Sequence, residues 1–213
     1  MKIFLDTGDM EEINKWKTMG VIDGVTTNPT ILKKQHSDLS LFAQLLSPMP
    51  VSLEVTTDDL DLMIEQGKKL FEYSPNVRVK IPVQNSLGQI TYLVIKQLEQ
   101  NYNVRVNATA VMSFGQVMLA AKAGATYISI FWGRIGNEGG NAQKVVCDSV
   151  DWLKYWNYKS EIIVGSIHTV DDVLQVANCK AHIITIPPNI LTQVVENEGT
   201  KKVVKQFIED SKK

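Results

Sequence analysis

Short β-like runs alternate with amphipathic helical stretches along the whole 213-residue chain, and this alternation constrains the fold more than any other feature. Runs rich in valine, isoleucine and threonine predict strands at residues 3–6, 22–26, 51–55, 77–81, 104–107, 127–130, 162–164 and 183–186. Helical patterns fall at residues 9–18, 60–71, 87–99, 113–123, 142–155, 170–177, 189–195 and 201–209. Strands and helices in this order favour a parallel sheet with right-handed crossovers.

Eight such units predict an α/β fold, a (β/α)8 TIM barrel with an extra C-terminal helix, in a single domain over residues 1–213. The alternative is an open doubly wound sheet, but no G-x-G-x-x-G follows the first run. The chain is 44% hydrophobic, which suffices for one sizeable core. Trp152, Tyr155 and Trp156 share one face of a predicted helix, a spacing that indicates core packing more than a subunit contact.

Composition and charge exclude several classes of function. The net charge is -1 and no basic stripe argues for nucleic acid. No run is long enough to span a membrane, and the N-terminus reads as a strand rather than a signal peptide, so a cytoplasmic protein is expected. Cys147 and Cys179 lack C-x-x-C spacing and are interpreted as reduced, buried thiols. His36, His168 and His182 lack metal-ligand spacing, so no metal or other cofactor is expected.

A lysine inside an otherwise apolar strand is the strongest functional signal. Residues 77–83 read V-R-V-K-I-P-V and place Lys80 among apolar neighbours. Burying an ammonium costs on the order of several kcal/mol unless it is paired or loses its proton. A neutral amine is a nucleophile that forms a Schiff base with a carbonyl. The alternative is a lysine that extends to water or blunts a sheet edge.

In a barrel, the site lies at the C-terminal ends of the strands. The polar or reactive residues at these ends are Asp6, Thr26, Thr27, Asn28, Glu54, Lys80, Asn107, Thr109, Ser129, Phe131, Arg134, Ser166 and His168. Singly, Asp6 could cap a helix, Asn28 could form a turn, and Arg134 could be solvated on a glycine-rich loop. Strand eight ends in Pro187-Pro188 and offers no reactive group. An amine, two carboxylates, amides and hydroxyls that converge on one barrel mouth predict imine chemistry.

Several segments resemble one family over essentially the whole chain. They are F-L-D-T at 4–7, D-G-V-T-T-N-P-T at 23–30, V-K-I-P at 79–82, the stretch 120–129, F-W-G-R at 131–134 and V-G-S-I at 164–167. These segments are similar to the small transaldolases and their fructose-6-phosphate aldolase relatives. The resemblance implies a (β/α)8 barrel, a class I mechanism without metal or cofactor, and a homo-oligomeric ring, a pentamer or decamer.

The resemblance also implies a role for each site residue. Lys80 matches the Schiff-base nucleophile, Asp6 the acid/base at the C3–C4 bond, and Glu54 a proton shuttle that works through a water held with Thr109. The matching substrate contacts are Thr27, Asn28, Asn107, Ser129 and Phe131, and the distal anion is held by Arg134 and Ser166. The partner is therefore a small sugar phosphate or sulfosugar.

One pair of residues separates the two branches of the family, and two other positions depart from the usual family pattern. The aldolase branch has Gln and Tyr where this chain has Glu54 and Phe131, so the transaldolase pattern is favoured. The family usually has a second basic residue where this chain has His168, and a smaller apolar residue at Trp132. A less positive pocket suits a monoanion such as the sulfonate of 6-deoxy-6-sulfofructose, whereas His168, Lys33 or Lys34 could equally serve phosphate. The chain could also be a fructose-6-phosphate aldolase, or a barrel that binds a sugar phosphate without turning it over.

Overall fold

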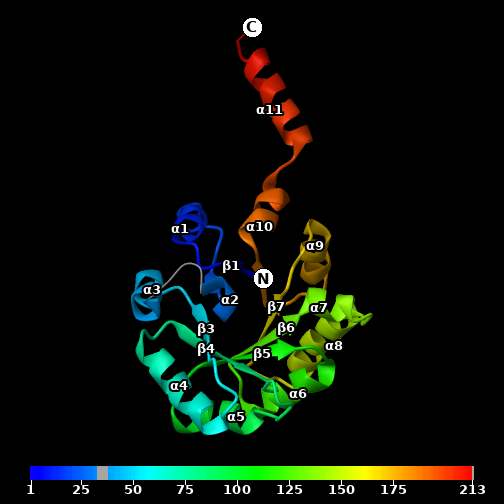
Figure 1. The fold of residues 1–213 in the computed structure, drawn as a ribbon. Coiled ribbons are helices and arrows are strands. Elements are labelled where there is room, and N and C mark those ends of the chain that lie inside the picture. The colour runs from blue at the N-terminus through cyan, green and yellow to red at the C-terminus, as the bar shows by residue number, and fades with distance from the viewer. Residues whose placement is uncertain (33–37, 213) are drawn as a thin grey trace.

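Eight parallel strands close into a barrel in chain order, with β8 pairing back to β1 (Figure 1). The structure is a computed structural model that describes residues 1–32 and 38–212. The strands are β1 Lys2–Asp6, β2 Gly24–Thr26, β3 Val51–Glu54, β4 Val77–Pro82, β5 Val106–Val111, β6 Tyr127–Phe131, β7 Glu161–Gly165 and β8 Ile183–Ile186. This closure confirms the (β/α)8 prediction, and the open doubly wound alternative is wrong.

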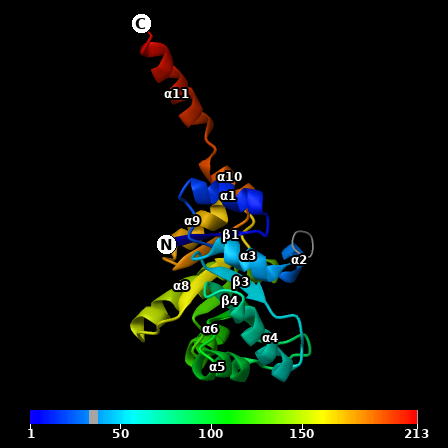
Figure 2. The same cartoon turned by 90° about the vertical axis from the view of Figure 1, so that its left-hand side faces the viewer.

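The helices pack around the outside of the barrel, except α11, which projects away from it (Figures 1 and 2). They are α1 Met10–Thr18, α2 Pro29–Leu32, α3 Leu39–Leu46, α4 Leu60–Glu72, α5 Tyr92–Asn101, α6 Phe114–Ala123, α7 Trp132–Asn137, α8 Ala142–Tyr155, α9 Val170–Asn178, α10 Pro188–Val195 and α11 Glu198–Asp210. The helices α2, α3 and α7 were not predicted from the sequence. The helix predicted at residues 87–99 begins only at Tyr92, because the segment before Thr91 forms a turn with Gly88 at a φ of +80°.

The two-residue period of the strands builds an apolar floor under a polar mouth. Side chains two residues apart on a strand face the same side of a sheet. Phe4, Tyr127, Ile163 and Ile183 form a buried cluster of their own, and the Phe4 and Tyr127 rings meet edge to face at 6.2 Å. The inward-facing residue two positions after Phe4 is Asp6. The packing of the floor therefore determines which side chains at the C-terminal strand ends point into the barrel.

The two cysteines form a disulfide, so the interpretation of both as reduced, buried thiols is wrong. Cys147 on α8 and Cys179 at the C-terminal end of α9 are bonded, with a Cα–Cα distance of 4.7 Å. No local pattern indicated this bond, because the pair is 32 residues apart and is brought together only when the two helices pack side by side. The expected cytoplasmic location stays a prediction, and the cysteines no longer support it.

Reduction of this disulfide should lower the thermal stability. A crosslink over this separation stabilises by about 3–4 kcal/mol in the chain-entropy description, which corresponds to a Tm change on the order of 10 °C. We expect Tm to fall by that amount in reductant or in Cys147→Ser. Alkylation of the unfolded, unreduced protein, followed by mass measurement, checks the bond directly. Two alkyl groups on that sample, or an unchanged Tm in reductant, would contradict the crosslink.

The aromatic residues of α8 do not all pack into the core, which corrects the expectation for this helix face. Trp152 is half-buried and stacks on Tyr158 with ring centroids 4.7 Å apart. Tyr155, the last residue of α8, and Trp156, its C-cap, are 79% and 61% exposed. Among the described residues, no helix has the length and apolarity needed to cross a membrane.

Candidate active site

Lys80 is buried in the barrel and paired with Glu54. The two residues are register partners on adjacent strands β4 and β3. Lys80 Nζ lies 2.8 Å from Glu54 Oε2, and the Lys80 side chain is 8% exposed. Nζ also donates a 2.9 Å hydrogen bond to the carbonyl oxygen of Thr27. The alternative of a lysine that extends to water or blunts an edge is therefore wrong, and pairing is how this barrel accommodates the buried ammonium.

Asp6 is the second carboxylate at the mouth, and its surroundings differ from those of Glu54. Asp6 Oδ1 accepts a 2.7 Å hydrogen bond from Thr26 Oγ1. Burial raises the pKa of Asp6 above its usual value, although the Thr26 hydrogen bond and the charge of Lys80 oppose this rise. The site thus holds one carboxylate in direct contact with the amine and another whose pKa is raised by burial.

Two threonine hydroxyls form a hydrogen-bonded chain that ends at the Asp6 carboxylate. Thr26 Oγ1 and Thr185 Oγ1 are 2.5 Å apart, and both residues are buried. A hydroxyl has one proton, so Thr26 can donate to Asp6 only if Thr185 donates to Thr26. Neither threonine was assigned a role from the sequence. Thr185 could have been found from its isolated position in the apolar run I-I-T-I, whose first isoleucine lies in the barrel floor.

A pocket of about 190 Å³, which we call the mouth pocket, brings most of the predicted residues together. Its lining residues are Asp6, Thr26, Asn28, Lys80, Ser129, Phe131, Arg134, Gly165, Ser166 and Thr185. Asn28 also caps α2, because its Oδ1 accepts a hydrogen bond from the N–H of Ile31 at 3.0 Å. The mouth pocket therefore joins an amine and a carboxylate at its base to a guanidinium at its rim.

The other predicted residues lie just behind this lining. Asn107 accepts a 2.7 Å hydrogen bond from Ser129 Oγ, and its amide donates to Ser52 Oγ at 3.1 Å. Thr27 contributes its carbonyl to Lys80, while its hydroxyl donates to the Ser52 carbonyl at 2.7 Å. Thr109 Oγ1 is buried and has no hydrogen-bond partner among the described residues. Thr109 is thus a polar group able to bind a reacting water or a substrate hydroxyl.

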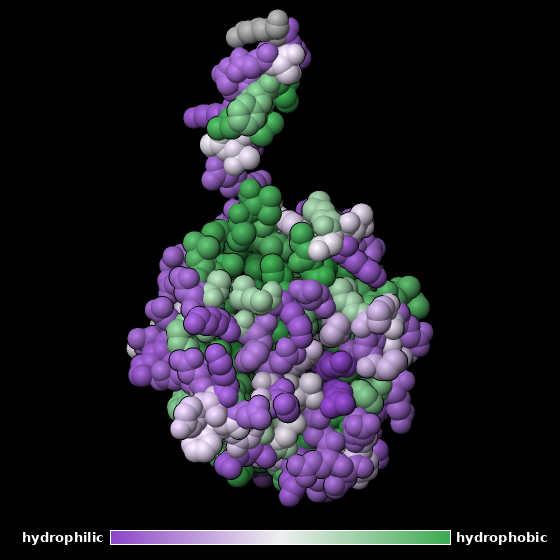
Figure 3. Space-filling model, turned by 180° about the vertical axis from the view of Figure 1, so that it is seen from behind, coloured by the Kyte–Doolittle hydropathy of each residue, from purple (hydrophilic) through white to green (hydrophobic). Residues whose placement is uncertain are grey.

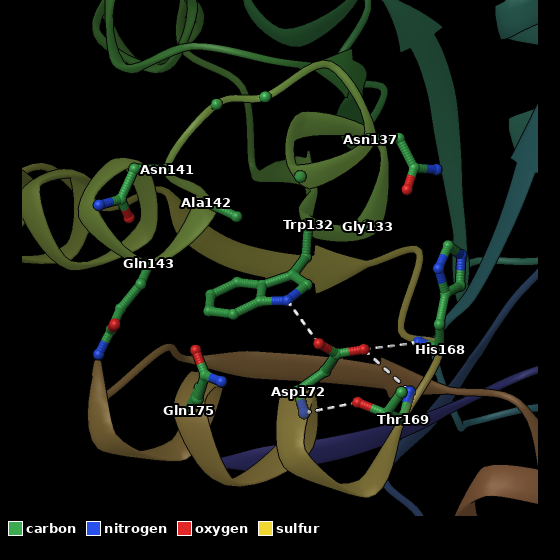
Figure 4. A pocket seen from close by; sticks show the side chains of 13 residues that line it. Trp132, Gly133, Asn137, Asn141, Ala142, Gln143, His168, Thr169, Asp172 and Gln175 are labelled. Carbon is green, nitrogen blue, oxygen red and sulfur yellow. Dashed lines mark hydrogen bonds between the residues drawn. The ribbon is translucent and has the colours of Figure 1, made fainter.

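The distal rim is built from α7 and the loop after β7. Arg134 lies within helix α7 rather than on a glycine-rich loop, and its guanidinium lies 5.7 Å from the Phe131 ring centroid. Ser166 adopts a left-handed backbone with a φ of +59°. His168 does not line the mouth pocket; its Nε2 is 3.4 Å from Ser166 Oγ, and its ring faces a separate cavity on the outer side (Figure 4). Lys33, Lys34 and His36 lie outside the described residues.

No three His, Cys, Asp or Glu side chains gather as metal ligands would anywhere in residues 1–32 and 38–212. The reactive groups that the described residues bring together are instead an amine, carboxylates and hydroxyls. An amine paired with a carboxylate, beside a second carboxylate and a distal cation, is suited to form and break an imine with a small anionic carbonyl compound.

Comparison with known proteins identifies the family of the chain. The family described as transaldolase/fructose-6-phosphate aldolase matches residues 3–46 and 37–213. A probable transaldolase from Herpetosiphon aurantiacus is 37% identical over 213 residues, covering 99% of this chain and 94% of the relative. Probable transaldolases from Clostridium botulinum (strain Langeland) and Nitrosopumilus maritimus are each 35% identical, covering 100% of this chain and 97% and 96% of the relatives. The chain belongs to the transaldolase/fructose-6-phosphate aldolase family and is an enzyme of that family.

Solved structures of low sequence identity share the barrel alone. A lactate oxidase from Pediococcus acidilactici matches with a TM-score of 0.62 at 12% identity, covering 87% of this chain and 62% of that one. Thiamine phosphate pyrophosphorylase from Pyrococcus furiosus matches with a TM-score of 0.57 at 12% identity, covering 87% and 85%. These likenesses concern the fold and say nothing of the chemistry.

Removal of the Thr26 hydroxyl should move the pH profile of the enzyme. The Thr26 hydrogen bond lowers the pKa of Asp6, so Thr26→Val should raise that pKa further. We expect the acidic limb of kcat/KM to shift upward by about one pH unit, as the loss of one hydrogen bond to a charged group predicts. Thr185→Val removes only the second hydroxyl of the chain and should shift the limb less. Equal profiles for the wild type and Thr26→Val would show that Asp6 does not govern this limb.

Proposed function

We propose that the enzyme is a transaldolase that transfers a dihydroxyacetone unit from a ketose phosphate to an aldose phosphate through a Schiff base on Lys80. Fructose 6-phosphate and sedoheptulose 7-phosphate are the donors with the required structure. The observation that carries the proposal is the buried Lys80, which is paired with Glu54 and lines the same pocket as Asp6. The direct contact supplies a base for the amine, and the second carboxylate remains available for the substrate.

Imine formation begins with a proton transfer. Glu54 Oε2 lies 2.8 Å from Lys80 Nζ and can accept a proton from the ammonium. The free amine attacks C2 of the ketose and forms a carbinolamine. Glu54 then returns the proton to the departing hydroxyl through a water bound by Thr109, whose hydroxyl is buried and lacks a partner among the described residues. Loss of water leaves an iminium ion on Lys80.

Cleavage and transfer follow from the electron demand of the iminium. Asp6 takes the proton of the C4 hydroxyl, the C3–C4 bond breaks, and its electron pair forms an enamine on Lys80. The aldehyde fragment leaves, and the enamine attacks the carbonyl of the acceptor aldehyde while Asp6 returns its proton. Water then adds to the resulting iminium, and cleavage of the C–N bond releases the new ketose and the Lys80 amine. Burial raises the pKa of Asp6 toward neutral pH. A carboxyl with such a pKa can both accept and return a proton in this reaction.

Borohydride trapping tests the covalent step. With fructose 6-phosphate as donor, the reduced protein should carry a three-carbon adduct on Lys80, identified by mass spectrometry of the peptide. An enzyme that binds the ketose but yields no adduct would support a non-catalytic sugar-binding barrel instead. Free dihydroxyacetone released without an acceptor would support an aldolase, against which Glu54 and Phe131 argue.

A second candidate donor is 6-deoxy-6-sulfofructose. The observation that favours it is the composition of the distal rim: the cations that line the mouth pocket are Lys80 at its base and Arg134 at its rim, and His168 lines the outer cavity instead. A sulfonate carries a single negative charge and needs less positive charge than a phosphate. Comparison of kcat/KM for the two donors decides between them, and a strong preference for sulfofructose would overturn the phosphate proposal.

The proposal includes a homo-oligomer, and α11 supports this part. The helix projects away from the barrel in both views, and none of its residues is buried (Figures 1 and 2). Val203, Val204, Phe207 and Ile208 form an exposed apolar face along it, and Figure 3 shows apolar side chains on the body below it as well. A single helix of 13 residues is marginally stable in water, so we expect it to pack on another copy of this chain.

Charges on that face should dissociate the assembly. Val204→Asp with Phe207→Asp places carboxylates where the expected contact is apolar, and sedimentation velocity should then show smaller particles than for the wild type. Lys202→Asp changes the opposite side of the same helix and should leave the particle mass unchanged. A wild-type protein that sediments as a monomer would contradict the oligomer.

A further inference from the structure

The two side chains at the distal rim depend on the backbone that carries them. Arg134 forms no ion pair with a carboxylate among the described residues, and α7 is a helix of only six residues. Ser166 is carried by the loop between β7 and α9 at a left-handed φ. The affinity for a distal anion therefore depends on how rigidly α7 and this loop are held relative to each other.

One carboxylate ties these two elements. Asp172 on α9 accepts a 2.9 Å hydrogen bond at Oδ1 from Trp132 Nε1 of α7. Its Oδ2 accepts the backbone N–H groups of His168 and Thr169, each at 2.9 Å, as Figure 4 shows. Trp132 precedes Arg134 by two residues, and His168 follows Ser166 by two. The carboxylate thus holds the Trp132 side chain on α7 and the backbone that follows Ser166.

The two elements also touch directly, without spare room. The N–H of Gly133 donates a 3.0 Å hydrogen bond to the carbonyl of Ser166. A Cβ atom at Gly133 would lie 2.5 Å from that oxygen and 2.5 Å from His168 Cε1. Small displacements of α7 would therefore be transmitted to the Ser166 loop.

Together these elements form a thin wall between two spaces. On the inner side, Phe131, Arg134 and Ser166 line the mouth pocket. On the outer side lies a cavity of about 530 Å³, which we call the outer cavity. Its lining residues are Trp132, Gly133, Gly136, Asn137, Gly139, Gly140, Asn141, Ala142, Gln143, His168, Thr169, Asp172 and Gln175 (Figure 4). Among the described residues, no side chains pack against α7 and the Ser166 loop where the outer cavity lies. The hydrogen bonds of Asp172 hold these two elements together on that side.

Asp172 is suited to this role because it stays ionised. Burial alone would raise the pKa of Asp172, but the hydrogen bonds from His168, Trp132 and Thr169 outweigh this effect and lower the pKa. An ionised acceptor forms stronger hydrogen bonds than a neutral one.

We propose that Asp172 and Trp132 are positioning residues that hold Arg134 and Ser166 in register for the distal anionic group of the substrate. This inference rests on the proposed function for the identity of the substrate, but its geometry requires only that the mouth pocket binds an anion at that end. Neither side chain touches the reacting atoms, so their removal should weaken the binding of the anion rather than slow the chemistry.

Binding of an unreactive ligand tests the proposal without turnover. Glucitol 6-phosphate has the length and phosphate of the donor but no carbonyl, so calorimetry reports its Kd independently of catalysis. Trp132→Phe removes the indole N–H and keeps an aromatic ring, and Asp172→Asn removes the charge and keeps the shape. Each should weaken binding about tenfold, as the loss of a charged hydrogen bond predicts.

Thr169→Ala is the matched control. It removes the hydroxyl that accepts the backbone N–H of Asp172 at 3.1 Å. The bonds that the Asp172 carboxylate accepts from Trp132 Nε1 and from the backbone N–H groups of His168 and Thr169 stay in place. The substitution should lower Tm through the weaker helix cap and leave the Kd unchanged. In steady-state assays, the two test variants should raise KM for the phosphorylated donor and leave kcat/KM for unphosphorylated fructose as in the wild type.

The outcomes separate this inference from the proposed function. Weaker binding of glucitol 6-phosphate in both test variants, with the control unchanged, supports the positioning role even if no transaldolase activity is found. A wild-type Kd in both variants would overturn it, as would equal weakening in Thr169→Ala. Failure of the wild type to bind either glucitol 6-phosphate or its sulfonate counterpart, 6-deoxy-6-sulfoglucitol, would also overturn it, because no anion would then be held at the rim.

Discussion

Replacement of Lys80 by methionine should abolish transfer and leave the barrel folded. Methionine has a similar length and no amine, so neither carbinolamine nor imine can form. We expect kcat/KM to fall by at least about 10⁴-fold, because the covalent route is lost rather than weakened. Borohydride treatment with fructose 6-phosphate should leave the peptide that contains residue 80 unlabelled.

The stability of this variant needs its own control, because Lys80 is half of a buried pair. Without its partner, the partly buried Glu54 becomes an uncompensated charge, a loss on the order of 3 kcal/mol for such pairs. The double variant Lys80→Met with Glu54→Gln removes both charges and should recover much of the Tm but none of the activity. Residual transfer in a well-folded Lys80→Met protein would rule out the lysine mechanism.

The fold was predictable because its dominant signal is local. Each strand is a short apolar run, and each long helix has its own amphipathic pattern, so chain order favoured the parallel barrel that the structure has. The short helices were missed for physical reasons. The helix α7 contains two glycines, which have low helix propensity, and α2 is a single turn that begins at Pro29. Tertiary contacts, rather than propensity, maintain both.

The site was predictable in its ionisable groups and less so in its supporting contacts. Lys80 and Glu54 stand out as charges in apolar strands, and the barrel register makes them neighbours. The roles of Thr26 and Thr185 were missed because hydroxyls in strands are common, and these roles depend on an inward direction set by distant residues in the barrel floor. The Asp172 contacts and the disulfide depend on the packing of α7, α8 and α9, which no single segment encodes.

Replacement of Asp6 by asparagine should separate the two halves of the reaction. Lys80 and Glu54 remain, so the imine can still form, but no carboxylate takes the C4 hydroxyl proton. We expect kcat to fall by about 10²–10⁴-fold, the usual contribution of a general base. Borohydride should then trap the whole six-carbon donor on Lys80, rather than the three-carbon fragment expected for the wild type. A three-carbon adduct that forms at the normal rate would exclude Asp6 as the base.

The same substitution should also stabilise the protein at neutral pH. Burial raises the folded-state pKa of Asp6 above the unfolded value, so its contribution to stability is present below the ordinary carboxyl pKa and is lost as the pH rises through the raised value. A neutral asparagine avoids that loss. The variant should therefore melt a few degrees above the wild type at pH 8, on the order of what 1 kcal/mol gives in a domain of this size, and the difference should shrink toward pH 4. Melting curves across this range test the sign of the effect. If the Tm of the variant relative to that of the wild type is lower at pH 8 than at pH 4, ionised Asp6 stabilises the fold. With the expected sign, burial of the Asp6 carboxylate lowers the stability of the barrel and at the same time provides a base for the substrate proton.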